Sequence, residues 1–157
     1  MSNPIRYEER YCLFLDILGF KEVVEQSAQP SANTAKAGYP AVGVYFSLKQ
    51  IASNFKYKAA VVGVNGVMKA SSRVVMQFSD SVVISYRATE AGGLAEMLYD
   101  VLHLQLTLVQ RGLMIRGAIT KGALHHDQDF VFGPALNEAA GLKRWRCTQG
   151  SLSIGIC

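Results

Sequence analysis

Residues 11–18 (YCLFLDIL) constrain the fold more than any other segment, because they form an almost continuous apolar run that holds a single carboxylate. Such a run is typical of a central strand that is covered on both faces. Gly19 ends the predicted strand, and residues 20–29 have the composition of a helix that stops before Pro30. Asp16 needs a compensating partner, since an ionised carboxylate in an apolar strand is costly unless it is paired.

A second carboxylate stands in the clearest predicted hairpin. Residues 73–78 (RVVMQF) and 81–86 (SVVISY) are rich in β-branched and aromatic side chains and are joined at Ser79-Asp80. Taken singly, Asp80 is interpreted as a turn residue that bonds its own backbone, and Asp16 as a buried carboxylate that pairs with Arg or Lys. On adjacent central strands, the two would bring oxygen donors to one rim, where a hard cation such as Mg²⁺ binds.

The remaining pattern predicts one α+β domain over residues 1–157, with helices packed on an antiparallel-rich sheet. The expected elements are a loop over 28–39, a helix over 42–55, a strand and turn over 58–68, a helix over 90–111 that stops at Gly112, a strand over 113–120, a connection over 122–129, a short strand over 130–132 and a helix over 135–143.

Composition excludes several classes of protein. Half of the 157 residues are hydrophobic, the net charge is +4 and the pI is about 9.0, which suits a single folded core and a polyanionic ligand. No apolar stretch is long enough to span a membrane and the N-terminus is too polar for a signal peptide, so we expect a cytoplasmic protein with its three cysteines reduced. The basic run 143–146 (KRWR) favours solvated surface over a nucleic-acid interface.

Three separated motifs carry a resemblance to a known family. They are FLDILGF (14–20), FSDS (78–81), and RGAITKG (116–122) followed by FGPALNEAAGL (132–142). In this order they resemble the class III nucleotidyl cyclases, whose catalytic domain has a ferredoxin-like fold. Within that family the sequences of the first and last motifs are most similar to those of the bacterial Pycsar pyrimidine cyclases. Those enzymes convert UTP or CTP to a cyclic monophosphate that activates an effector in antiphage defence.

The resemblance implies a set of site residues. Asp16, the Ile17 carbonyl and Asp80 would hold two Mg²⁺ or Mn²⁺ ions. Backbone N–H groups at Leu18, Gly19 and Phe20 would meet the triphosphate at the start of a helix.

The last motif implies a ribose contact and a partner. Asn137 would orient the ribose of a nucleotide held by the other subunit of a head-to-tail homodimer. The sequence does not distinguish two roles for Arg116: it binds phosphate, or it pairs with a neighbouring carboxylate.

The departures from the family pattern support an alternative. Gly141 stands where class III cyclases commonly carry an Arg that neutralises charge in the transition state, and Lys143 or Arg144 would have to replace it. Residues 1–10 are interpreted as an N-terminal extension and 144–157 as an atypical or truncated tail. The alternatives are a non-catalytic cyclase-like module that binds nucleotide or a partner subunit, and an adenylate or guanylate cyclase.

Other polar and aromatic residues are interpreted structurally. His125 and His126, next to Asp127 and Asp129, are expected in an exposed loop rather than a metal cluster. His103 is expected at the core or its boundary. The tyrosines are expected to pack rather than to contact a base; they are Tyr39, Tyr45 and Tyr57.

Overall fold

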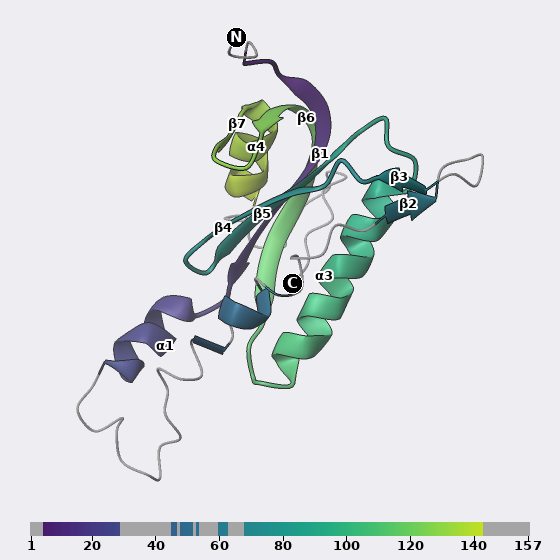
Figure 1. Ribbon diagram of the computed structural model, residues 1–157. Coiled ribbons are helices and arrows are strands. Elements are labelled where there is room, and N and C mark those ends of the chain that lie inside the picture. Colours follow the sequence, from purple (N-terminus) through teal and green to yellow (C-terminus); the bar gives the residue numbers. More distant parts are fainter. Residues whose placement is uncertain are drawn as a thin grey trace.

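The computed structural model describes residues 5–28, 45–46, 48–51, 53, 60–62 and 68–142. Figure 1 shows a curved sheet with helices on both sides. The elements in chain order are β1 (Glu8–Ile17), α1 (Phe20–Ser27), β2 (Ala60–Val62), β3 (Met68–Ala70), β4 (Val74–Phe78), β5 (Ser81–Arg87), α3 (Gly93–Val109), β6 (Ile115–His126), β7 (Val131–Phe132) and α4 (Pro134–Leu142).

The main sheet is antiparallel throughout and has the order β4-β5-β1-β6-β7. β1 is its central strand, with β5 on one side and β6 on the other, as the apolar run at residues 11–18 predicts. β2 and β3 pair separately. The predicted hairpin is confirmed, since β4 and β5 pair directly and turn at Ser79-Asp80.

Alternate residues of β1 point into two different cores. Leu13, Leu15 and Ile17 belong to the cluster that buries α3, whose inner residues include Leu104 and Leu108. On the other face, Cys12 and Phe14 pack with Ala135 and Ala139 of α4. The two helices therefore cover opposite faces of the sheet (Figure 1). Because side chains alternate along a strand, Asp16 lies on the α4 face.

The predicted elements that fall on described residues are found, and two of them differ in extent. β1 begins at Glu8, so Glu8–Arg10, which we expected to precede the fold, belong to the central strand. β6 continues to His126, so most of the predicted connection over 122–129 is strand. Residues 45–46, 48–51 and 53 are helical within the segment predicted as a helix over 42–55. The predicted loop over 28–39, apart from Ala28, and the tail over 144–157 lie outside the described residues.

The cysteine and membrane predictions are tested in part. Cys12 is a free, fully buried thiol, and burial raises its pKa to about 12. Cys147 and Cys157 lie outside the described residues. No helix in the described part of the chain has the length and hydropathy needed to span a bilayer.

Gly117 is the tightest point between β1 and β6. A Cβ at this position would collide with the Phe14 carbonyl oxygen and would lie 2.5 Å from Cδ2 of Leu15. We expect Gly117→Ala to lower the free energy of unfolding by about 1–3 kcal/mol, because the two central strands would have to separate. Urea denaturation measures this. Gly141→Ala is the matched control, since a Cβ at Gly141 meets open space and should leave stability unchanged or slightly higher; equal losses in both variants would contradict the account.

Candidate functional site

Asp16 is a buried carboxylate near the C-terminal end of the central strand. Its residue is 5% exposed, and its neighbours Leu15 and Ile17 are core residues of the opposite face. Sheet pairing fixes its position, because Asp16 stands directly opposite Arg116 of β6. The site therefore begins with a carboxylate that the two longest strands hold in place.

Arg116 neutralises Asp16 through a two-point contact. Its Nε donates to Asp16 Oδ1 at 2.9 Å and its Nη2 donates to Oδ2 at 3.3 Å. The hydrogen bond to Asp16 and the charges of Asp16 and Asp80 raise the pKa of Arg116. The side chain of Asp16 is 6% exposed whereas that of Arg116 is 46% exposed. Of the two readings left open by the sequence, the structure shows the carboxylate pairing.

Asp80 lies in the turn between β4 and β5, immediately before Ser81. The preceding residue, Ser79, has a φ of 54°, a left-handed conformation found in tight turns. β5 runs antiparallel to β1 with Leu15 opposite Val82, so the start of β5 lies beside the end of β1. Because Asp80 acts electrostatically on Arg116, two carboxylates far apart in the chain share the field of one guanidinium. We call this edge of the sheet, with Asp16, Asp80 and Arg116, the rim.

The turn after β1 leads directly into α1. Gly19 has a φ of 74° and is the N-cap of a helix that begins at Phe20, with no side-chain cap. The Leu18 N–H donates to the Met114 carbonyl oxygen at 2.8 Å and is therefore engaged within the chain. The first N–H groups of a helix have no partner inside it, so the Gly19-Phe20 turn presents donors next to the carboxylates. The Leu18 N–H differs from these donors, because its hydrogen bond to Met114 joins the end of β1 to the segment before β6.

The residues at this rim fit a divalent cation bound together with phosphate. Mg²⁺ needs one or two carboxylates and takes its other ligands from phosphate oxygens and water. Asp16 and Asp80 provide the carboxylates, and the guanidinium of Arg116 already marks the rim as a place where positive charge is stabilised. No group of three or more His, Cys, Asp or Glu side chains that could hold a metal is found among the described residues. Side chains would therefore supply only a few of the ligands of such a cation.

Asn137 and Gly141 lie on α4 and are exposed. α4 begins beside the middle of the sheet, where Thr120 Oγ1 donates to the Ala135 carbonyl at 2.8 Å. Thr120 pairs with Cys12, so α4 starts four positions along β1 from Asp16. Asn137 therefore stands on the Asp16 face of the sheet but belongs to a different region of it.

A second polar cluster was not predicted. Buried Arg10 donates from Nε to Ser85 Oγ at 2.9 Å, and Ser85 Oγ lies 2.8 Å from His126 Nδ1. Arg10 can only donate, whereas the Ser85 hydroxyl can either donate to His126 Nδ1 or accept from it, according to the tautomer of the imidazole. Polar residues scattered over three apolar strands give no local signal. Only the burial pattern of the folded sheet reveals the cluster.

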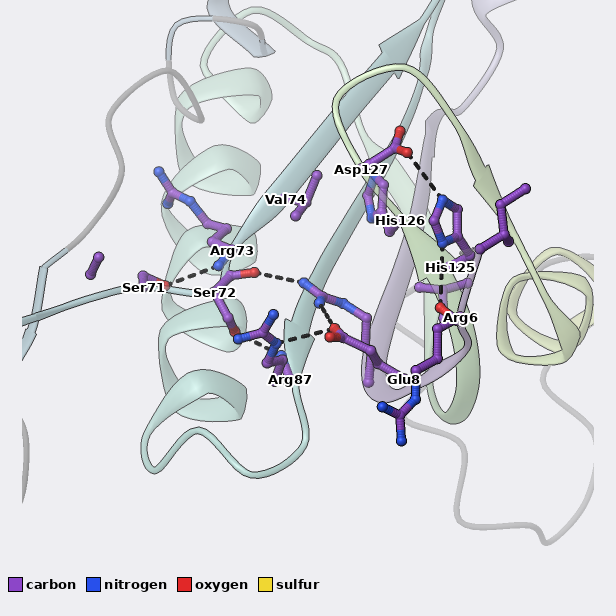
Figure 2. Close-up of a pocket in the computed structure, with 14 residues that line it drawn as sticks. Arg6, Glu8, Ser71, Ser72, Arg73, Val74, Arg87, His125, His126 and Asp127 are labelled. Atoms are coloured by element: carbon purple, nitrogen blue, oxygen red, sulfur yellow. Dashed lines mark hydrogen bonds and ion pairs between the residues drawn. The ribbon is translucent and has the colours of Figure 1, made fainter. Parts of the chain in front are cut away.

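This cluster forms one wall of a pocket of about 640 Å³ at the other end of the sheet from Asp16. Figure 2 shows Glu8 facing Arg87, and His125 between Asp127 and the backbone of Arg6. Glu8 accepts from both Arg10 and Arg87, so the polar groups here largely satisfy one another.

Two interpretations of histidine side chains are corrected. His125 and His126 lie on β6 rather than in an exposed loop, and His126 is only 7% exposed because it packs under the Arg10-Ser85 pair. His103 lies on the exposed side of α3, where it stacks on Tyr99 at 6.5 Å, because the core side of that helix is filled by aliphatic residues. Tyr45 is 60% exposed, while Tyr39 and Tyr57 lie outside the described residues.

His126 predicts a pH dependence of stability. Burial, followed by the charge of Arg10, lowers its pKa from 6.5 to about 4. Below pH 6.5 His126 is protonated in the unfolded chain but stays neutral in the folded chain. The free energy of unfolding therefore decreases as the pH falls toward 4, by at most ~3 kcal/mol. Urea denaturation of the parent and of His126→Gln between pH 7 and 5 measures this loss. Equal pH dependence in both would contradict a buried neutral imidazole.

The comparison with solved structures is the one that informs on the fold. No family model matches the chain, and no curated protein matches it. Seven chains of solved structures do match. One is the adenylyl cyclase CyaB from P. aeruginosa, with a TM-score of 0.54 and 17% identity over 88% of this chain and 72% of that chain. The antiparallel sheet, the helices on its two faces and this likeness show an α+β fold similar to that of this adenylyl cyclase.

Proposed function

We propose that the protein is a metal-dependent nucleotidyl cyclase, which converts a nucleoside triphosphate to a 3′,5′-cyclic monophosphate and pyrophosphate. The observation that carries this proposal is the rim where Asp16 and Asp80 share the field of Arg116 beside a helix start. Asp16 is held at the rim by its two-point contact with Arg116. The same carboxylate, with Asp80, supplies the oxygen ligands that Mg²⁺ takes together with phosphate.

In this proposal the main task of the chain's own residues is to hold the metal ions and to position the triphosphate. Asp16, Asp80 and the Ile17 carbonyl would hold two Mg²⁺ or Mn²⁺ ions, which when bound supply acidity at the 3′-hydroxyl and charge for the leaving pyrophosphate. The Gly19-Phe20 turn receives the triphosphate. The 3′-hydroxyl would give its proton to solvent water, and its oxygen would bond to the α-phosphorus as the bond from that phosphorus to the bridging oxygen breaks. That bridging oxygen leaves with pyrophosphate.

The finer assignment is a pyrimidine cyclase that acts on UTP or CTP in antiphage signalling. It is supported by the wording LDILGFK at residues 15–21 and by RGAIT and FGPALNEA in the later strands and α4, which resemble the bacterial Pycsar enzymes. The cyclic product would act on a separate effector. An adenylate or guanylate cyclase would differ only in the base that it accepts.

The proposal includes a head-to-tail homodimer. Asn137 is exposed on α4 and is displaced along the sheet from Asp16 of the same chain. A second copy in reversed orientation would bring its Asn137 to the nucleotide held at Asp16, where the amide would orient the ribose. The exposed position of Asn137 agrees with a contact across an interface.

A specific observation also favours a second candidate, a non-catalytic nucleotide-binding module. Gly141 replaces the transition-state Arg of the resembling family, and its Cβ direction faces open space in the described structure. Phosphoryl transfer without that charge would be slow. Stabilisation by UTP without turnover would support this second candidate.

One assay tests the proposal. The purified protein is incubated with Mn²⁺ and each of UTP, CTP, ATP and GTP, and the products are separated by chromatography. We expect cyclic UMP or cyclic CMP together with pyrophosphate. A cyclic purine product would retain the cyclase and overturn the pyrimidine assignment, whereas no cyclic product from any triphosphate would overturn the proposed activity.

A further inference from the structure

We propose that Arg116 is an exchangeable internal counter-ion, which occupies Asp16 until a divalent cation arrives with the triphosphate and then transfers to the phosphates. This inference rests on the proposed function. We therefore expect cation and triphosphate to bind cooperatively. The cation displaces Arg116 from Asp16, and the triphosphate supplies a new anionic partner for the displaced Arg116. Free cation, by contrast, binds weakly.

Arg116 holds Asp16 through a two-point contact. Arg116 occupies both oxygens of Asp16, at 2.9 and 3.3 Å. A cation that coordinates Asp16 must displace at least one of these hydrogen bonds, and it also repels the guanidinium. Arg116 therefore competes with the cation for the same carboxylate.

The difference in exposure shows which partner moves. The Asp16 side chain is 6% exposed and stands on the central strand, whereas that of Arg116 is 46% exposed and ends in a long flexible group. Arg116 can leave Asp16 by rotating toward solvent without any change in the sheet. Asp16 cannot follow it.

The charges at the rim show where Arg116 goes. Asp16 holds the guanidinium through two hydrogen bonds, and the start of β5 brings Asp80 to the same rim as a second negative charge. Once a cation holds both carboxylates, Arg116 has lost these partners and faces an added positive charge. A polyphosphate beside the Gly19-Phe20 turn is the anion that compensates it, and a guanidinium binds phosphate with two parallel hydrogen bonds.

Calorimetric titration with MnCl₂ tests the exchange without relying on turnover. In the absence of nucleotide, we expect Arg116→Gln to bind Mn²⁺ about tenfold more tightly than the parent, because the competitor is gone. With α,β-methylene-UTP present, whose α-to-β bridge cannot be cleaved, the variant should bind the analogue about tenfold more weakly. Arg116→Lys keeps the charge but not the two-point contact and should lie between the two.

Lys121→Gln is the matched control. Lys121 lies on the same strand, is 49% exposed and pairs with exposed Glu9, so its replacement removes an equal charge away from the rim. It should change neither affinity.

The outcomes separate two failures. Equal Mn²⁺ affinity in the parent, Arg116→Gln and Arg116→Lys overturns the exchange and leaves the proposed cyclase standing, as does a Lys121→Gln effect as large as that of Arg116→Gln. No Mn²⁺ binding by any of the proteins, with or without the analogue, removes the cation site and with it both the exchange and the proposed function.

Discussion

Asp16→Asn is expected to reduce cyclic nucleotide formation by about 1,000-fold or more while leaving the fold intact. Asparagine keeps the size of the side chain and one oxygen for Arg116, but it removes the charge that would hold a divalent cation. Initial rates of cyclic product formation, measured with Mn²⁺ and the preferred triphosphate, give the size of the effect. Stability should change by no more than about 1 kcal/mol, because the asparagine oxygen still accepts from Arg116, whose side chain is already half exposed and solvated.

Asp80→Asn provides the companion test. Asp80 lies in a turn and is half buried, so its replacement should cost little stability yet lose activity on a similar scale. If the two carboxylates act as one unit, the double variant should be no slower than the slower single variant. Full activity in Asp16→Asn would show that the buried carboxylate is only a structural partner of Arg116.

Gly141→Arg is expected to increase kcat by at least about tenfold. In the resembling family an Arg at this position of the closing helix neutralises charge in the transition state, and charges of this kind are worth roughly 100-fold or more. The described structure has room for the side chain, since nothing lies within 4 Å of a Cβ at Gly141. Steady-state rates for the parent and the variant measure the gain.

Gly141→Ala separates charge from helix propensity. Alanine also favours the helix over glycine, by up to about 1 kcal/mol, but carries no charge, so it should raise stability without raising kcat. Equal rates for all three proteins would mean that this position does not face the transition state. The charge would then come from another residue, for which Lys143 and Arg144 were the candidates from the sequence.

The two carboxylates of the rim could be predicted from the sequence because each of them breaks a local rule. Asp16 interrupts an apolar run, and Asp80 sits between two runs of β-branched residues, so both stand out from their neighbours along the chain. The prediction that the two carboxylates lie close together requires their strands to be neighbours in the sheet. The order β5-β1-β6 shows that β1 and β5 are neighbours. The partner of Asp16 did not follow, because strand register is a long-range property that pairs residues a hundred positions apart.

The Arg10-Ser85-His126 cluster could not be predicted for a related reason. Each residue is ordinary in its own segment, and His126 was interpreted as exposed because its neighbours are polar. Its burial depends on β6 continuing past Gly122, which local composition argues against. Pairing with the N-terminal half of β1 overrides that local preference, since Arg10 stands opposite Gly122 in the ladder.

The central claim is that Asp16 and Asp80 hold the same divalent cation beside the start of α1. Paramagnetic broadening of backbone amide signals by Mn²⁺, measured by NMR with α,β-methylene-UTP present, tests it most directly. We predict that signals from residues 16–20 and 79–82 broaden together, and that Asp16→Asn abolishes the broadening in both segments. Broadening confined to one segment, or centred on the distant pocket around His126, would contradict the account.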